Sequence, residues 1–180
     1  MISTKFDKFK KGFIEKANDD NIKELVRNGN CDNLNYIDTI NVTNMKDMFN
    51  SSQFNGDISL WNVSNVTNMS FMFSNSQFNG DISRWDVSKV TNMYSMFYES
   101  KFNQDISQWD VSKVEFMSDM FAKTIFNKDI SQWNTSNVNN METMFWLSQF
   151  NQDVSRWDVS KVKDMHRMFH FSKFNILSIS

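Results

Sequence analysis

The sequence predicts an α/β solenoid that winds in the right-handed sense, and three observations lead to this fold class. A pattern of Phe, Asp, Trp and Met recurs every 24 residues, it covers most of the 180 residues, and each repeat contains a strand-like half and a helix-like half. A fixed period of about 20 to 50 residues is typical of solenoids and arrays. The right hand follows from the general rule for connections between parallel strands.

The Trp residues set the register of the repeat, because they fall 24 residues apart at Trp61, Trp85, Trp109, Trp133 and Trp157. Each unit opens with Phe-Asn, has an Asp three residues after the Phe, and later carries a Met-Phe pair. We expect the recurring apolar positions to form a linear core. This core comprises the five Trp residues together with Ile58, Ile82, Ile106, Ile130, Phe73, Phe97, Phe121 and Phe145.

The repeat divides the chain into three parts. Residues 1–29 lack the pattern and are predicted to form an N-terminal helical cap, whereas residues 176–180 are a tail or terminal strand. Residues 30–175 form the repeat solenoid, whose six units are 30–53, 54–77, 78–101, 102–125, 126–149 and 150–173. A solenoid needs a cap because its first coil would otherwise expose its apolar cross-section.

Two helices are predicted in the cap. The first is amphipathic and has its apolar face at Phe6, Phe9, Phe13, Ile14 and Ala17. The second begins at Asn21, where Glu24 three residues later completes a capping box, and it ends at Gly29. Its buried face is predicted to be Ile22, Leu25 and Val26. The first unit is degenerate, since Leu34, Ile37 and Thr39 stand where later units have Ile, Trp and Val.

Within a unit the two halves have different local periods. The half DISxW[DN]V is rich in β-branched and aromatic residues and alternates across Trp-x-Val, which predicts a strand. The half VTNMxxMF places apolar residues at i, i+3, i+6 and i+7, which predicts about two turns of helix. A unit of this length cannot hold two full helices. The sequence therefore favours a stack of the leucine-rich-repeat kind, with a parallel sheet.

Composition and charge exclude several classes of protein. The net charge of −2 and the pI near 5.7 give no support for nucleic-acid binding. The single Cys31 excludes an internal disulfide framework. No apolar run has the roughly 18 residues of a membrane span, and no signal-peptide pattern or lipobox is present, which predicts a cytoplasmic chain or a domain expressed without its signal.

The units FNQDISQWDVSKVEFMSDMF (102–121) and FNGDISRWDVSKVTNMYSMF (78–97) resemble the BspA-type leucine-rich-repeat surface proteins, specifically the mycoplasma-type repeat domain of unknown function. The resemblance covers about residues 37–175. It implies a non-enzymatic solenoid, often on a bacterial cell surface, that is associated with adhesion or protein binding.

No residue pattern predicts catalysis, a cofactor or a metal. The Asp column, which is Asp57, Asp81, Asp105, Asp129 and Asp153, could stack carboxylates for calcium, but each Asp is better placed to accept backbone N–H bonds at a turn. His166 and His170 are four residues apart, yet no third ligand and no HExxH pattern accompanies them. No Gly-rich phosphate loop or nucleophile–base pair occurs.

Binding residues are expected at positions that vary between units, such as Arg84, Asp86, Lys89, Tyr94 and Tyr98. One candidate surface is a polar column of Leu60, Arg84, Gln108, Gln132 and Arg156, flanked by Asp86, Asp110 and Asp158. The other is an apolar set of Tyr98, Trp146, Leu147, His170 and Phe171, for which packing under a loop is the competing interpretation. The leading hypothesis is a scaffold for a protein ligand. The alternative is a structural solenoid that associates end to end through the apolar, alternating tail ILSIS.

Overall fold

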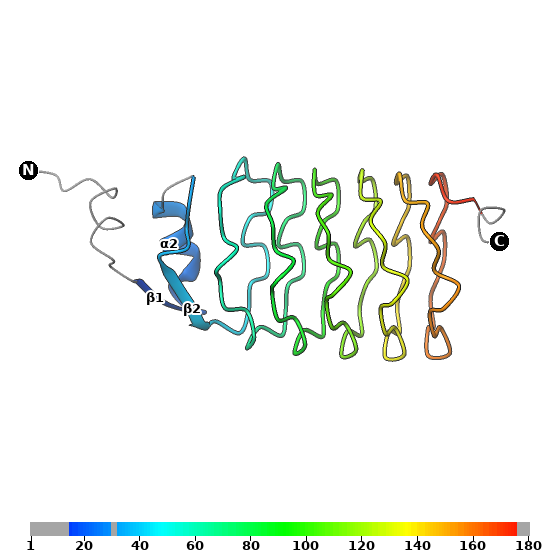
Figure 1. The fold of residues 1–180 in the computed structure, drawn as a ribbon, viewed down its shortest axis with the longest axis horizontal. Coiled ribbons are helices and arrows are strands. Elements are labelled where there is room, and N and C mark those ends of the chain that lie inside the picture. Colours follow the sequence, from blue (N-terminus) through cyan, green and yellow to red (C-terminus); the bar gives the residue numbers. More distant parts are fainter. Residues whose placement is uncertain (1–14, 30–31, 176–180) are drawn as a thin grey trace, which may run out of the picture.

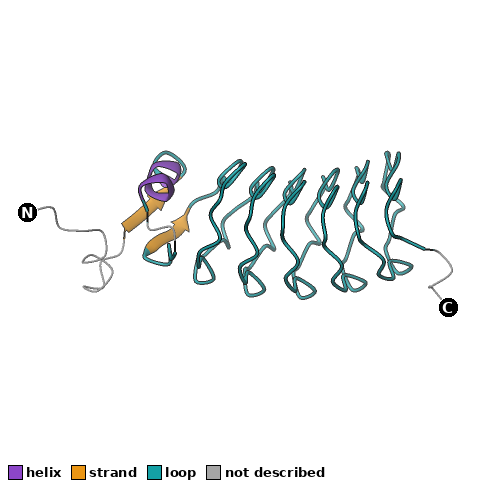
Figure 2. Cartoon of the chain, turned by 90° about the horizontal axis from the view of Figure 1, so that it is seen from above, coloured by secondary structure: helices purple, strands orange, loops and turns teal. Residues whose placement is uncertain are grey.

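The computed structural model describes residues 15–29 and 32–175, and within them successive units lie side by side as coils along one long axis (Figure 1). The described residues include one helix, α2 (Ile22–Asn28), and one two-stranded parallel sheet of β1 (Glu15–Asn18) and β2 (Ile37–Asn41). These elements lie together at one end, and the coils beyond them are turns and loops (Figure 2). The described chain is therefore a repeat structure with a small mixed cap.

The cap differs from the prediction in its first element. Ala17 lies in β1, not in a helix, and is 2% exposed, whereas the other residues of the predicted first helix lie outside the described residues. The second helix is present as α2, but the capping box is not, because the Asn21 side chain makes no cap hydrogen bond and accepts one from the Asn18 N–H instead. Gly29 follows α2, and a Cβ there would lie 2.2 Å from Leu34 Cδ2.

The cap continues the hydrogen-bonding pattern of the coils. In later units the N–H of one coil donates to the carbonyl 24 residues earlier, as Thr67 does to Thr43 at 2.8 Å. For Thr43 itself the acceptor is the Asp19 carboxylate, which also accepts from the Asn44 N–H, at 2.7 and 3.0 Å. Burial by itself raises the pKa of Asp19, but the hydrogen bonds outweigh this effect and lower the pKa below its usual value. A charged side chain thus supplies the acceptor that a preceding coil would supply.

The predicted helix within each unit is wrong. Its residues form instead a ladder segment, by which we mean residues 45–51 and the equivalents 69–75, 93–99, 117–123, 141–147 and 165–171. In residues 69–75, four N–H groups donate to the next unit: Met69 to Asn92, Phe71 to Tyr94, Phe73 to Met96 and Asn75 to Tyr98, at 2.7–2.9 Å. The intervening N–H groups close local turns, such as Met72 to Met69 at 3.2 Å. Neighbouring coils, not a helix, thus satisfy this backbone.

The turns of the ladder segment require left-handed residues. Two positions per segment have φ between 51° and 61°, for example Phe71 and Asn75, and none of these residues is Gly. Phe71 is the third residue of the turn that the Met72 N–H closes onto Met69, which is where a type II turn needs a positive φ. A non-Gly residue in this conformation costs about 1–2 kcal/mol, so the ladder and the core must hold it in place.

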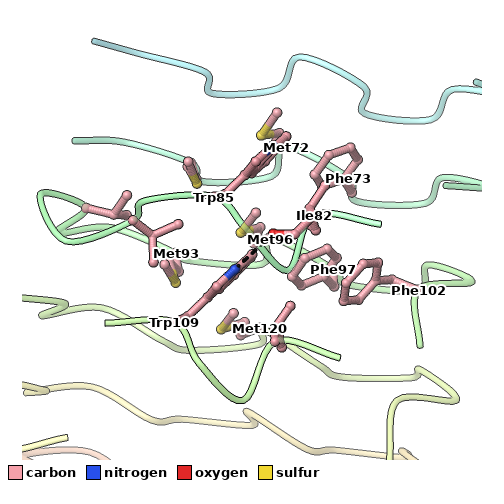
Figure 3. Packing of buried hydrophobic residues seen from close by; sticks show 14 of the residues in the cluster. Met72, Phe73, Ile82, Trp85, Met93, Met96, Phe97, Phe102, Trp109 and Met120 are labelled. Carbon is pink, nitrogen blue, oxygen red and sulfur yellow. Dashed lines mark hydrogen bonds between the residues drawn. The ribbon is translucent and has the colours of Figure 1, made fainter. Parts of the chain in front are cut away.

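The predicted strand within each unit is also absent from units 54–173, although its apolar residues point inward. The Trp61 N–H closes a turn onto the Ile58 carbonyl at 3.1 Å, and the Val66 N–H closes another onto Val63 at 2.8 Å. Between coils this half is joined by side chains. In the Trp column that begins at Trp61, each indole N–H donates to the carbonyl of residue i−27, as Trp109 does to Ile82 at 3.1 Å (Figure 3). The same bond is made by Trp61, Trp85, Trp133 and Trp157 at 3.0–3.3 Å.

The core is a pair of phenylalanine columns beside the Trp column (Figure 3). In the first column, Phe49 to Phe169, ring centroids of successive units are 5.4–5.7 Å apart, and in the second, Phe54 to Phe174, they are 6.2–6.5 Å apart. Each Phe of the first column also stacks on the Phe that opens the following unit, five residues later, at 4.0–4.7 Å. Every residue that the sequence placed in the core is at most 7% exposed.

Candidate binding groove

Polar side chains that recur in every unit accept hydrogen bonds from backbone N–H groups. In the Asp column, each Oδ1 accepts the N–H of the Ser two residues later, at 2.8–2.9 Å, which forms an Asx turn. The same bond recurs in an Asn/Asp column of Asn62, Asp86, Asp110, Asn134 and Asp158, at 2.9–3.1 Å. Among the described residues, no group of three or more His, Cys, Asp or Glu is placed to hold a metal ion.

These hydrogen bonds favour the charged carboxylate. In the Asp column, the Ser N–H is the main cause that lowers the pKa of Asp57, Asp81, Asp105 and Asp153. In the Asn/Asp column, the Ser hydroxyl is the main cause that lowers the pKa of Asp86, Asp110 and Asp158. Three residues expected at the binding surface therefore already hold a turn in place, with one oxygen each.

The Asn that follows each unit's first Phe forms a ladder. The Asn103 N–H donates to Asn79 Oδ1 at 2.8 Å, and the Asn127 N–H donates to Asn103 Oδ1 at 3.0 Å. The same bond joins the Asn residues from Asn55 to Asn175 at 2.7–3.0 Å. The Asn column thus joins successive coils, whereas the Asp and Asn/Asp columns form turns. The outward positions of the ladder segments remain for contacts with other molecules.

A groove of about 470 Å³ runs along these outward positions and crosses all six units. Buried Ser74 and Ser95 contribute small side chains to its lining, and four aromatic residues, Phe71, Tyr94, Tyr98 and Trp146, provide apolar surface. Its complete lining is Asn50, Phe71, Ser74, Asn75, Tyr94, Ser95, Tyr98, Asp119, Thr143, Trp146 and Arg167. A groove with apolar surface and a few polar groups is the usual form of a binding site.

Charged groups lie in the groove and at its edge. Burial raises the pKa of Asp119, and the hydrogen bond that Thr143 Oγ1 donates to Asp119 Oδ1, at 2.6 Å, partly opposes this effect. Lys123 forms an ion pair with Glu99, and this hydrogen bond is the main cause that raises the pKa of Lys123. Its Nζ also lies 5.2 Å from the Tyr98 ring centroid and 5.1 Å from that of Trp146.

The structure separates the two surfaces that the sequence suggested. Tyr98 and Trp146 line the groove, whereas the polar column of Arg84, Gln108, Gln132 and Arg156 is exposed on the turns between Ile and Trp and does not line it. The Gln108 and Gln132 amides donate to the neighbouring Ser hydroxyls, at 3.3 and 3.1 Å.

The remaining apolar candidates lie at the C-terminal side of the stack. Phe171 is 72% exposed and Leu147 is 42% exposed, so neither is packed under a loop. The His170 ring is 3.9 Å from that of Phe171, and both His166 and His170 are exposed. None of these four residues lines the groove.

Several groove residues were not identified from the sequence. Phe71, Asp119 and Thr143 line the groove and occupy one of the left-handed positions of the ladder segment. Glu99 and Lys123 lie outside this lining and occupy the other left-handed position. The signal that would have found them is the 24-residue period itself, because positions 71, 95, 119, 143 and 167 vary freely between units.

A regular stack of units with an aromatic groove defines this chain as a repeat protein. The comparison with family models agrees with that class, since one model matches residues 20–124 and again residues 85–178. The chain belongs to this family, which is described as mycoplasma protein of unknown function, DUF285. Comparisons with curated proteins and with solved structures each gave no match. Within the described part of the chain, no helix is both long and apolar enough to cross a membrane.

Proposed function

We propose that the chain is a right-handed solenoid scaffold without catalytic activity, which binds a protein partner through the groove of its ladder segments. The observation that supports this function is that different columns of the repeat have different structural roles. The Trp, Phe and Asn columns are used in packing or in hydrogen bonds between coils, whereas the groove gathers variable aromatic residues from several units. Exposed Tyr and Trp residues are frequent energetic centres of protein interfaces.

The groove is a better candidate than the polar column. It offers Tyr98 and Trp146 on one continuous surface, together with Asp119 and Arg167 as polar contacts. The polar column offers flexible side chains on separate turns, for which the ordering cost on binding is larger. An adhesion or surface-antigen role of the BspA type is the form of partner binding that we favour.

End-to-end association has less support than partner binding. All four N–H groups of a ladder segment face the following unit, so two copies that met at equivalent C-terminal ends would oppose donors to donors. A head-to-tail contact would instead meet the end at which α2 lies beside the first coil (Figure 1). The tail ILSIS, on which this alternative was based, lies outside the described residues.

The proposal can be tested without knowledge of the natural partner. A displayed library of random peptides is selected on the intact chain, and a recovered peptide is then titrated by calorimetry. Alanine at Tyr98 or Trp146 should weaken binding by about tenfold or more while the melting temperature stays unchanged. Alanine at Arg84 or Arg156 is the matched control and should have little effect. Equal affinity of the Tyr98 and Trp146 variants and the original chain would refute the groove as the site.

A further inference from the structure

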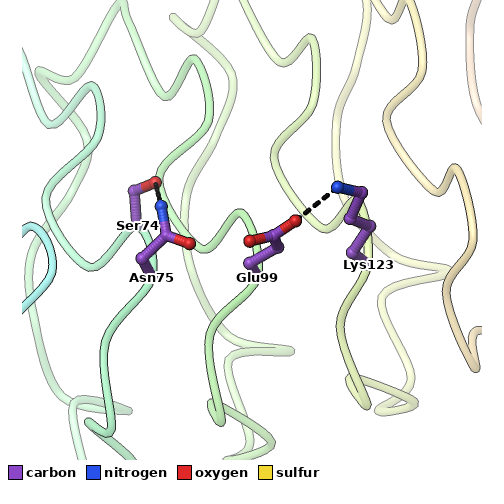
Figure 4. Close-up of polar contacts among 4 residues, drawn as sticks. All are labelled: Ser74, Asn75, Glu99 and Lys123. Atoms are coloured by element: carbon purple, nitrogen blue, oxygen red, sulfur yellow. Dashed lines mark hydrogen bonds and ion pairs between the residues drawn. The ribbon is translucent and has the colours of Figure 1, made fainter.

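The strongest unassigned feature is the surrounding of the Lys123 ammonium group. Its Nζ is paired with the Glu99 carboxylate and lies 5.2 Å from the Tyr98 ring centroid and 5.1 Å from the Trp146 ring centroid. Glu99 and Lys123 occupy the same position in two successive units, so the ion pair runs along the stack (Figure 4). The two units on either side of Lys123 thus supply two rings and one carboxylate to a single cation.

The sequence of one column creates the space for this cation. Tyr98, Ala122 and Trp146 occupy the same position in three successive units, and Ala122 is fully buried. Because Ala122 has only a methyl group, the two large rings on either side of it are not separated by a third large side chain. The Lys123 ammonium lies within cation–π distance of both rings, which is about 6 Å.

The cage of Tyr98, Trp146 and Glu99 has the composition of an ammonium receptor. Aromatic faces attract cations, including the Lys ammonium, through the ring quadrupole, and aromatic cages bind quaternary ammonium ligands in this way. The cage adjoins the groove, which contains a second carboxyl group at Asp119. If Lys123 leaves, the Glu99 carboxylate loses its ion-pair partner, and the two rings lose the cation that lies near them. The vacated cage would therefore be complementary to another cation.

The ion pair of Lys123 and Glu99 lies at the surface of the stack. The Lys123 side chain is 32% exposed and that of Glu99 is 36% exposed, so solvent reaches both groups of the ion pair. An exposed pair of this kind contributes little to stability, because solvent screens both charges. A competing cation would therefore have to overcome only a weak internal contact.

We infer that this cage is a binding site for a primary ammonium group, and that Lys123 occupies it only until the lysine side chain of a bound partner displaces it. This inference deepens the proposed function, because it names the chemistry by which a partner segment in the groove is recognised. The Lys123 side chain then acts as an internal competitor, which sets a threshold for binding and disfavours partners without a lysine at this point.

The test uses n-butylammonium chloride, which corresponds to the whole lysine side chain as a free molecule, at constant ionic strength. The readout is the NMR signal of the Trp146 indole N–H, which is assigned by its loss in Trp146→Phe. The indole N–H groups of Trp61, Trp85, Trp109, Trp133 and Trp157 donate to backbone carbonyls in the core and serve as internal references. A residue-specific readout separates binding in the cage from binding elsewhere.

The variant Lys123→Gln removes the competing charge and keeps most of the side-chain stem. We expect it to bind n-butylammonium about two- to fivefold more tightly than the original chain does, because the weak internal contact no longer competes. Adding Glu99→Gln should weaken this binding again, and Lys101→Gln, which changes an exposed lysine outside the cage, should behave like the original chain. Because the probe is a small cation, failure of this site and failure of protein binding are distinguished.

Two results would overturn the inference. The first is that Lys123→Gln binds the probe no more tightly than the original chain. The second is that neutral n-butanol shifts the Trp146 signal as strongly as n-butylammonium does, which would show a merely apolar contact. Melting curves of each variant come first, and if Lys123→Gln unfolds, Lys123→Met replaces it with the same expected gain.

Discussion

Replacement of Trp109 by Ala tests the stacking of the coils most directly. Trp109 is 3% exposed, its indole lies 6.4 Å from the Phe97 ring centroid, and its N–H donates to the Ile82 carbonyl at 3.1 Å. The substitution leaves a cavity between two units and removes a bond between them. Large aromatic residues replaced by Ala in a core cost about 3–5 kcal/mol, and we expect this range for Trp109→Ala.

The hydrogen bond alone contributes a smaller part of this cost. The Ile82 carbonyl also accepts the Trp85 N–H at 3.2 Å, so it keeps one partner when the indole is removed. A hydrogen bond whose acceptor remains satisfied is worth about 0.5–1.5 kcal/mol. Trp109→Phe, which keeps an aromatic ring, should therefore cost about 1–2 kcal/mol, well below the Ala variant.

Urea denaturation followed by far-UV circular dichroism is the suitable assay, because removal of a Trp alters the fluorescence signal itself. The matched control is Trp157→Ala, which should cost less, since Trp157 is 7% exposed and the described units cover it on one side only. A free energy of unfolding for Trp109→Ala within about 0.5 kcal/mol of the original chain would refute the assignment of this column to the core. A broadened transition would instead show that the two halves of the stack unfold separately.

Three further outcomes are expected. Asn103→Ala removes the acceptor of the Asn127 N–H and should lower the free energy of unfolding by about 0.5–1.5 kcal/mol. The control Asn62→Ala leaves the Asn ladder intact, so the amide exchange of Asn127 should not change in it. Leu147 has φ 54°, so Leu147→Gly should be more stable than Leu147→Ala by about 1 kcal/mol in thermal melts, and the opposite order would contradict a left-handed backbone there. Hydrogen bonds lower the folded-state pKa of seven Asp residues in the two turn columns, so the stability that these carboxylates contribute is present above about pH 3.9 and is lost as the pH falls through the folded pKa. The urea midpoint should therefore drop steeply in this acidic range. A midpoint that rises there would show that Asp119 dominates, because its raised pKa has the opposite effect on stability.

The period and the inward-facing residues could be predicted from the sequence, because burial repeats whenever the coil repeats. The local conformation could not. Met69, Met72 and Phe73 are all fully buried at i, i+3 and i+4, which is also the pattern of a helix face. A chain of turns that each close over three residues returns side chains inward at the same interval, as the Met72 N–H bond to Met69 shows. The pattern reports which residues point inward, and it does not report where their N–H groups find acceptors.

The same limit applies to the groove, for a different reason. Tyr98 and Trp146 are 48 residues apart in the sequence, yet the stacking places Lys123 within 5.2 Å of the Tyr98 ring centroid and within 5.1 Å of that of Trp146. A contact of this kind depends on which column faces outward, and the left-handed φ of Glu99 and Lys123 sets that direction in each ladder segment. A repeat of fixed period therefore fixes the core by its constant columns, while recognition depends on the combination of residues that adjacent units bring together. A variant in which units 78–101 and 102–125 change places should accordingly keep the stack and lose the cage. The cage requires Tyr98, Ala122 and Trp146 to follow one another in that order.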